Sequence, residues 1–496
     1  MNMIFKRFLR LAAFSLVLAG GTAHAAEEQF PEDDEGTGGL LDQTVPVAAE
    51  DDAAGAVATL GPPRQRKADV REELLDEFDN YKRLMSEGIY DEADTVAKRV
   101  VTLAIQLTGP RSSETAKALT NLGIVQHRNK QFDAAQQNFE AAIDIIEENE
   151  DRLNRRLINP LKGLGAAQLE GGRPDLAKGT FTRAIHITHV NAGPHNMEQI
   201  EILESLAETN VRLGSIEDAR DMHDKIYVLH RRRYEDDQLA LIPSLMRRAE
   251  WQHRAGYITD EQTTYRRVIR IIETHSGKED VRLVEPLTKL GESYYFQDLH
   301  GEQVTYYNPS GGEIYLKRAL RIAESSPKSD WAAESNTKLA LADFYMMQGN
   351  LSRSRRLYGE IWESLAGDEA KSLFRDEIFG RAVPLNSRPI PEFASEAGQN
   401  PLGTPSEGFM QGSVTVSFSV SDRGRVNDLG PVEVIPAEFT DMEKLVHREL
   451  RGRLYRPRFE DSEPVTTNEV FTHLFYYKQS DLEDRREAAA AGDSDS

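Results

Sequence analysis

A register of 42 residues constrains the fold of this chain more than any other feature of its sequence. A small side chain recurs at this spacing inside a helix-like apolar pattern, at Gly123, Gly165, Ala207, Ala249 and Gly291. The register extends back to Tyr81 and forward, after 51 residues, to Ala342. Units of this length are typical of helix pairs that cannot bury both faces alone and must stack on their neighbours. The sequence therefore predicts seven stacked helix pairs.

The positions around the small residue fit such a pair. Seven residues later the chain carries a helix-ending glycine in five of the seven units, at Gly88, Gly172, Gly214, Gly256 and Gly349. Glycine adopts the left-handed conformation that commonly ends a helix. The nine extra residues of the sixth unit fall in the stretch HGEQVTYYNPSGG, between its two helices. We expect an inserted loop there.

This pattern resembles the tetratricopeptide repeat, in the longer form found in kinesin light chains, over residues 70 to about 365. The segment ALTNLGIVQHRNKQFDAAQQNFEAAIDIIEE carries the likeness clearly. The resemblance implies a groove lined by first helices that binds a protein or peptide. The matching positions are Asn121, Arg128, Lys162, Glu208, Arg212, Arg247, Glu250, Arg254, Lys289, Glu292 and Asp343. Asn121 matches an asparagine that often holds a ligand backbone in such grooves. A solvated helix face is the alternative interpretation of each position.

A different pattern begins after residue 378. Prolines mark a linker over residues 379–409, and residues 413–420 then alternate strictly between polar and apolar side chains, as a half-buried strand does. A turn at Asp422 to Gly424, a returning strand over 426–435, a helix over 439–450 and a last strand over 465–477 follow. The sequence predicts a small α+β unit of order β-β-α-β over residues 410–478.

This unit resembles the TonB C-terminal domain. The D-x-G turn, the triplet Val426-Asn427-Asp428 and the stretch Leu454-Tyr455-Arg456-Pro457 carry the likeness. The resemblance implies a periplasmic module that binds a peptide by strand addition. The last strand is the candidate edge, with Val470, Thr472, Leu474 and Tyr476 as its contact residues. Pairing of this strand within its own sheet or in a dimer is the alternative.

The N-terminal residues concern location. Lys6, Arg7 and Arg10 precede a short apolar run, and Ala23-His24-Ala25 forms an A-x-A cleavage site that leaves Ala26 as the new N-terminus. The run is about half of the ~20 residues that a membrane-spanning helix needs. We expect a cleaved signal peptide (1–25) and export to the periplasm with no stable membrane span.

Two acidic segments flank the folded part, a leader over 26–69 and a tail over 479–496. Both have little periodic apolar content and are predicted to be disordered. The repeats with a capping helix occupy 70–378 between the leader and the linker. The net charge of −22 argues against nucleic acid as a partner. The absence of cysteine excludes disulfides and thiolate metal sites.

Catalytic motifs are weak in this sequence. His186, His189 and His195 lie close together but lack a carboxylate at a metal-binding spacing. The run Arg231-Arg232-Arg233 could clamp an anion, although cations also favour the end of a helix for its dipole. No nucleotide, hydrolase or metalloprotease motif is present. We therefore predict no catalytic residue, no cofactor and no metal ligand.

These observations favour a non-catalytic periplasmic scaffold. It would hold one partner in the repeat groove while the C-terminal module engages another, a component of the cell envelope from the periplasm or the outer membrane. The alternative from another class is an accessory of TonB-type outer-membrane transport, which would require membrane retention. A hydrolase or metalloenzyme is a third hypothesis, and it would require bound metal.

Overall fold

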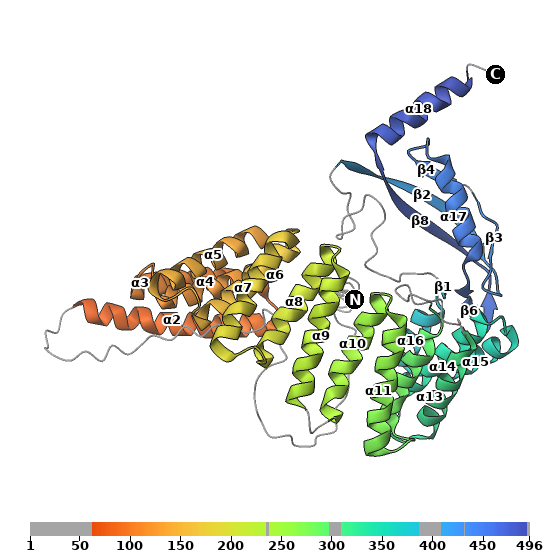
Figure 1. The fold of residues 1–496 in the computed structure, drawn as a ribbon, viewed down its shortest axis with the longest axis horizontal. Helices are drawn as coiled ribbons and strands as arrows, with labels where there is room; N and C mark the ends of the chain where they lie inside the picture. The colour runs from red at the N-terminus through yellow and green to blue at the C-terminus, as the bar shows by residue number, and fades with distance from the viewer. Residues whose placement is uncertain (1–61, 235–237, 297–308, 386–407, 431, 494–496) are drawn as a thin grey trace. The chain divides into compact units, whose positions relative to one another are not determined.

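The computed structural model describes residues 62–234, 238–296, 309–385, 408–430 and 432–493 (Figure 1). The predicted signal peptide with its cleavage point between Ala25 and Ala26, most of the leader, most of the linker and most of the inserted loop lie outside these residues. Among the described residues, none of the helices is both long and apolar enough to cross a membrane.

Seven antiparallel helix pairs follow one another along the chain. The first helices are α2 (Pro62–Glu87), α4 (Ser113–Arg128), α6 (Ile158–Glu170), α8 (Ile200–Arg212), α10 (Ile242–Arg254), α12 (Val284–Ser293) and α14 (Trp331–Met347). The second helices are α3 (Tyr90–Thr108), α5 (Phe132–Asn149), α7 (Pro174–Ala192), α9 (Ile216–Arg233), α11 (Ile258–Ser276), α13 (Glu313–Ser325) and α15 (Leu351–Ser364). A further helix, α16 (Glu369–Phe379), follows the last pair.

Short 3-10 turns lead into the first helices of the later pairs. These turns are η1 (Arg155–Leu157), η2 (Met197–Gln199), η3 (Leu239–Leu241), η4 (Val281–Leu283) and, before a second helix, η5 (Pro309–Gly312). The side chains of Asn154, Asn196 and Asp280 cap three of them by accepting a backbone N–H at 2.8–2.9 Å. Asn154 and Asn196 are 42 residues apart and Asp280 follows after a further 84, so the caps keep the register of the repeat.

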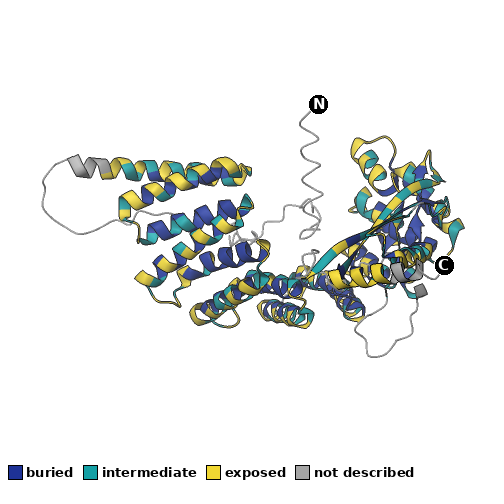
Figure 2. Cartoon of the chain, turned by 90° about the horizontal axis from the view of Figure 1, so that it is seen from above, coloured by how far each residue is buried: buried dark blue, intermediate teal, exposed yellow. Residues whose placement is uncertain are grey.

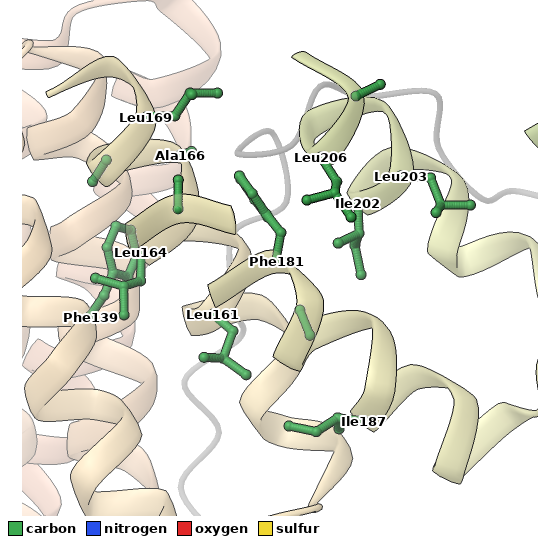
Figure 3. Close-up of a cluster of buried hydrophobic side chains, with 14 of the residues drawn as sticks. Phe139, Leu161, Leu164, Ala166, Leu169, Phe181, Ile187, Ile202, Leu203 and Leu206 are labelled. Carbon is green, nitrogen blue, oxygen red and sulfur yellow. The ribbon is translucent and has the colours of Figure 1, made fainter. Parts of the chain in front are cut away.

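The glycines of the register lie where a large side chain of the second helix rests on the first helix, an aromatic ring at Gly123 and Gly165 and Leu316 at Gly291. A Cβ atom on Gly123 would come within 2.8 Å of Phe139, and one on Gly165 within 2.6 Å of Phe181. Leu161 and Leu164 fill the space between these rings (Figure 3). The burial alternates accordingly, with buried faces turned to neighbouring helices and exposed faces to solvent (Figure 2). Close approach of the helices thus explains the register.

The first helix begins earlier than the sequence predicts. α2 starts at Pro62, inside the segment predicted to be a disordered leader. Proline is favoured in the first turn of a helix, where its missing N–H is not needed. Leu74, Phe78 and Tyr81, further along the helix, are buried in the first core cluster. Their packing supports the whole helix.

The C-terminal region contains a small sheet with one helix on its face. Its elements are β2 (Phe409–Val420), β3 (Val426–Asn427), β4 (Val432–Ile435), α17 (Thr440–Gly452), β5 (Tyr455–Arg456), β6 (Arg458–Glu460), β7 (Glu463–Val465) and β8 (Thr467–Lys478). β2 is central, with β3 and β4 along one side and β8 along the other, all antiparallel. Val446 and Leu450 of α17 share a core cluster with Val414 and Val416 of β2. The returning strand predicted over 426–435 is divided into β3 and β4 around Asp428, whose φ is +46°.

The predicted disordered tail is wrong for residues 479–493, which form helix α18 (Gln479–Asp493). Leu482 is buried in the C-terminal core, and Arg485 binds both carboxylate oxygens of Asp441 at 2.6 and 3.0 Å. The guanidinium of Arg485 also lies 4.3 Å from the ring centroid of Phe439. One buried apolar residue, a two-point ion pair and a cation–π contact therefore dock this helix. The sequence pattern was too short to reveal it.

Candidate binding groove and its junction with the C-terminal region

The first helices carry the candidate groove positions, and the structure separates these positions by burial. Asn121 and Lys162 are buried, at 2 % and 7 % exposure. The backbone carbonyl of Asn121 accepts a hydrogen bond from the Tyr81 hydroxyl at 3.0 Å, which ties the first two units together. The exposed positions are Arg247, Glu250 and Lys289, while Arg128, Glu208, Arg212, Arg254 and Glu292 are intermediate.

Ion pairs join the first helices of neighbouring repeats. The Lys162 Nζ atom of α6 lies 2.5 Å from an oxygen of Glu201 in α8. Arg212 of α8 donates to Glu208 and to the backbone carbonyl of Leu169, both at 3.1 Å. The contact with Leu169 places a cation at the C-terminal end of α6, where the helix dipole favours it. The charges of Lys162 and Arg212 are therefore paired within the repeat stack, which these contacts stabilise.

Two titratable groups lie at the same end of the first helices. Burial, together with the nearby Arg128, lowers the pKa of His127 to about 4. His127 is therefore neutral at pH 7, although its Nε2 atom lies 3.5 Å from the carboxylate of Glu170. Partial burial raises the pKa of the half-exposed Glu170, and the cations Arg212 and Arg128 oppose this rise.

The exposed set forms a charged surface on α10 and α12. Lys289 pairs with Glu292 at 3.1 Å, and Arg247 lies 4.0 Å from Glu204 of the preceding repeat. Both are pairs at the surface, of the kind that contributes at most about 1 kcal/mol to stability. We define Arg247, Glu250 and Lys289 as the groove triad. It exposes both signs of charge.

The last groove position is occupied by the chain itself. Asp343 of α14 stands in register with Glu208, Glu250 and Glu292, but Arg456 of β5 binds both of its oxygens, at 2.9 and 2.7 Å. The Tyr358 hydroxyl donates to the same carboxylate at 2.6 Å, and Arg456 also donates to the carbonyl of Ile378. Burial by itself would lower the pKa of Arg456, but Asp343 raises it above the ordinary value.

An aromatic cluster surrounds this ion pair. The ring of Phe459 lies 4.7 Å from that of Phe379, 5.5 Å from that of Tyr358 and 6.2 Å from that of Trp362, measured between centroids. β1 (Val383–Pro384) pairs with β5 beside it. We call these contacts the joint between the seventh repeat and the C-terminal region. The sequence predicts Asp343 as a groove position and Arg456 as part of the stretch 454–457. It gives no signal that these two residues, 113 positions apart, form an ion pair.

Strand β8 has the geometry of an available edge. It pairs with β2 along twelve residues, from Phe409↔Lys478 to Val420↔Thr467. Within the part of the chain that the structure describes, its other side pairs with no strand. Val470 and Leu474 are 68 % and 41 % exposed, on the sheet face opposite α17, and Thr472 and Tyr476 share that face. The Thr472 and Thr415 hydroxyls lie 3.0 Å apart across the pair.

The histidines singled out by the sequence are not brought into a metal-like arrangement. The His189 Nε2 atom lies 2.7 Å from the side-chain oxygen of Gln199, which links α7 to η2. No group of three or more His, Asp or Glu side chains that could hold a metal ion occurs among the described residues.

Comparison with known proteins identifies the family of the repeats. Residues 84–148 and 114–188 match the tetratricopeptide repeat family. The chain therefore contains tetratricopeptide repeats, and they continue structurally through the seven helix pairs. No curated protein matches the chain in sequence.

Several solved structures match part of this chain at low identity. Nearly identical TPR-like repeats from Podosopora anserina, described as those of a kinesin light chain, are 14 % identical, with a TM-score of 0.37, over 41 % of this chain and 97 % of theirs. BtubC (BKLC) from P. vanneervenii is 17 % identical, with a TM-score of 0.27, over 54 % of this chain and 87 % of that one. A signal transduction ATPase with a tetratricopeptide repeat sensor from Pyrococcus horikoshii is 13 % identical, with a TM-score of 0.40, over 63 % of this chain and 46 % of that chain.

Proposed function

We propose that this protein is a non-catalytic, exported scaffold that binds an extended segment of a partner protein along its first helices. The observation that carries the proposal is the groove triad, whose exposed charges of both signs lie on neighbouring first helices. Tetratricopeptide repeats are protein-binding scaffolds, which supports this class. The signal-like N-terminal sequence favours the periplasm as its location.

Charge reversal in the triad tests this proposal. The variant Arg247→Glu/Lys289→Glu should lose most capture of the partner from a periplasmic extract, because both cations are reversed. The matched control is Arg270→Glu/Arg356→Glu, which makes the same change of charge at exposed positions on the second helices α11 and α15. Equal capture by both variants would exclude the triad as the contact surface.

The C-terminal region supports a second binding mode. The free side of β8 can accept an extended peptide by main-chain hydrogen bonds, in the manner of strand addition. A lysine on such an edge suppresses pairing with another strand. We therefore expect Val470→Lys/Leu474→Lys to lose a second partner while the groove partner is retained. If both partners remain bound, β8 is not a binding edge.

An accessory role in TonB-type outer-membrane transport is the alternative, and it rests on the same edge. It predicts that the protein is recovered with the membrane fraction together with an outer-membrane transporter. Recovery in the soluble periplasmic fraction with the N-terminus at Ala26 would exclude direct energy coupling.

A further inference from the structure

One junction between second helices departs from the repeat in a way that suggests a ligand. A hollow of about 660 Å³ lies between α9 and α11 and is lined by Arg231, Arg232, Gln238, Leu241 and Arg267. Three of these five residues are arginines, in a chain whose net charge is −22. The hollow is formed by the second helices and the η3 turn. It is therefore a different site from the groove triad.

The repeats provide an internal comparison for this junction. At the equivalent place two repeats earlier, Arg183 of α7 donates to the carboxylate of Glu147 in α5. The residue 84 positions after Arg183 is Arg267, and the residue 84 positions after Glu147 is Arg231. The cation of the pair is therefore retained, while an arginine replaces its acidic partner. An anion is missing from this position relative to the earlier repeat.

The arginines of the hollow have no carboxylate of their own among the described residues. Arg231 and Arg232 are exposed and make no ion pair or hydrogen bond there, and Arg267 donates only to the Tyr227 hydroxyl. The side chain of Tyr227 lies between two cations, with its ring centroid 4.7 Å from Arg248 and 5.4 Å from Arg267. Arg248 is neutralised by Asp224 at 2.5 Å, so the cations of the hollow that have no carboxylate among the described residues are Arg231, Arg232 and Arg267.

Gln238 marks the second departure from the repeat. The residues in register with it, Asn154, Asn196 and Asp280, each use their side chain to cap a 3-10 turn, but the side chain of Gln238 makes no such cap. Its amide is exposed beside the arginines and can donate to a ligand oxygen. Leu241, which is 2 % exposed, supplies an apolar floor. The acidic run at positions 235–237 lies outside the described residues.

We infer that this hollow binds a small polyanion whose oxygens belong to phosphate or carboxylate groups. The planar forks of Arg231, Arg232 and Arg267 match both kinds of oxyanion in two-point contacts. The volume lies within the range of about 300–1,000 Å³ typical of small-molecule sites. The ligand takes the place that the carboxylate of Glu147 holds two repeats earlier.

Calorimetric titration of the full mature chain tests this inference. The probes are inorganic pyrophosphate for the phosphate class and citrate for the carboxylate class, each against sodium chloride of equal ionic strength. We expect one-to-one binding of at least one probe, with a Kd below about 1 mM, because several charge-assisted contacts act together. Binding of only one probe identifies the class of the ligand, and binding of neither refutes the site.

Two variants separate a built site from diffuse charge. Arg231→Glu restores the acidic residue of the earlier repeat, so it should weaken binding at least tenfold while the melting temperature stays the same or rises. Arg233→Glu makes the same change of charge two residues away, outside the hollow, and should change the Kd less than threefold. Equal weakening by both variants would overturn the proposal. If Arg231→Glu lowers the melting temperature, Arg232→Gln provides a milder removal and should still weaken binding.

Discussion

At the scale of single residues, glycines on the first helices make room for aromatic rings of the second helices. Gly165 has no space for a methyl group, because its Cβ would lie 2.6 Å from Phe181. Gly179, on the second helix of the same repeat, has no atom within 4 Å of the equivalent point. Glycine therefore allows close packing at position 165. At position 179 it only lowers the helix propensity.

Alanine substitution should separate these two roles. Gly165→Ala should destabilise the protein by about 1–3 kcal/mol, because overpacking outweighs the gain in helix propensity. Gly179→Ala should stabilise it by up to about 1 kcal/mol, since only the propensity changes. Thermal unfolding followed by circular dichroism measures both, and a stabilised Gly165→Ala variant would contradict the packing described here.

The buried His127 predicts a loss of stability in acid. Its pKa falls from an ordinary value of 6.5 when unfolded to about 4 when folded, mainly through burial. The neutral ring is favoured by folding, so its contribution is complete above pH 6.5 and is lost as the pH falls toward 4. Between pH 7 and pH 4.5 this residue should cost about 2 kcal/mol, and His127→Gln should reduce the acid sensitivity by that amount. An unchanged pH profile in urea unfolding of the variant would exclude this assignment.

At the scale of elements, the joint is the contact that could not be predicted from the sequence. The helix pairs, their order and the glycine at most of their ends follow from the 42-residue register, because each repeat contacts mainly its neighbours. β2, α17 and β8 follow from local periodicity in the same way. By contrast, the pairing of β1 with β5, the contact of Arg456 with Asp343 and the docking of α18 depend on residues far apart. No local pattern records them.

In the candidate site, too, the sequence predicts the local features but not the contacts between distant residues. Periodicity placed Arg247, Glu250 and Lys289 on first helices, and the structure leaves them exposed. It could not tell them from Lys162 or Asn121, because burial depends on the neighbouring repeat. The arginine run 231–233 was visible in the sequence, but Arg267 reaches the same hollow only because α9 and α11 pack as second helices of successive repeats.

The joint should be far more sensitive to substitution than surface ion pairs. Asp343→Ala leaves the buried guanidinium of Arg456 without its carboxylate and should destabilise the protein by about 3–5 kcal/mol. Glu279→Ala removes an exposed partner of Arg321 and should cost less than about 1 kcal/mol. Chemical unfolding measures both variants. Similar small losses would mean that the buried pair contributes little.

Limited proteolysis gives a second measure of the joint. Asp343→Ala should release the C-terminal region as a fragment faster than the Glu279→Ala control, since the aromatic cluster around Phe459 loses its anchor. An unchanged rate of fragment release would show that β1, β5 and the aromatic rings hold the joint without the ion pair.

At the scale of the whole molecule, the chain combines a repeat stack with a small sheet, and no disulfide joins them. Stability comes from burial and ion pairs, because the sequence has no cysteine. When the full-length precursor is expressed, the mature protein recovered from the periplasm should begin at Ala26, because the small residues at positions 23 and 25 form the cleavage motif. Intact-mass measurement of the periplasmic product checks this, and an uncleaved chain would contradict the proposed export.

The joint also limits how such a chain can be recombined in evolution. Because Arg456 and Phe459 rest on α14, α15 and α16, a crossover within the segment 379–409 would separate residues that complete one another's packing. A chimaera made there would inherit either a buried carboxylate or a buried guanidinium without its partner. A crossover between the sixth and seventh repeats would keep the pair together. The seventh repeat and the C-terminal region are thus one unit of inheritance, although the sequence divides them at a proline-rich boundary.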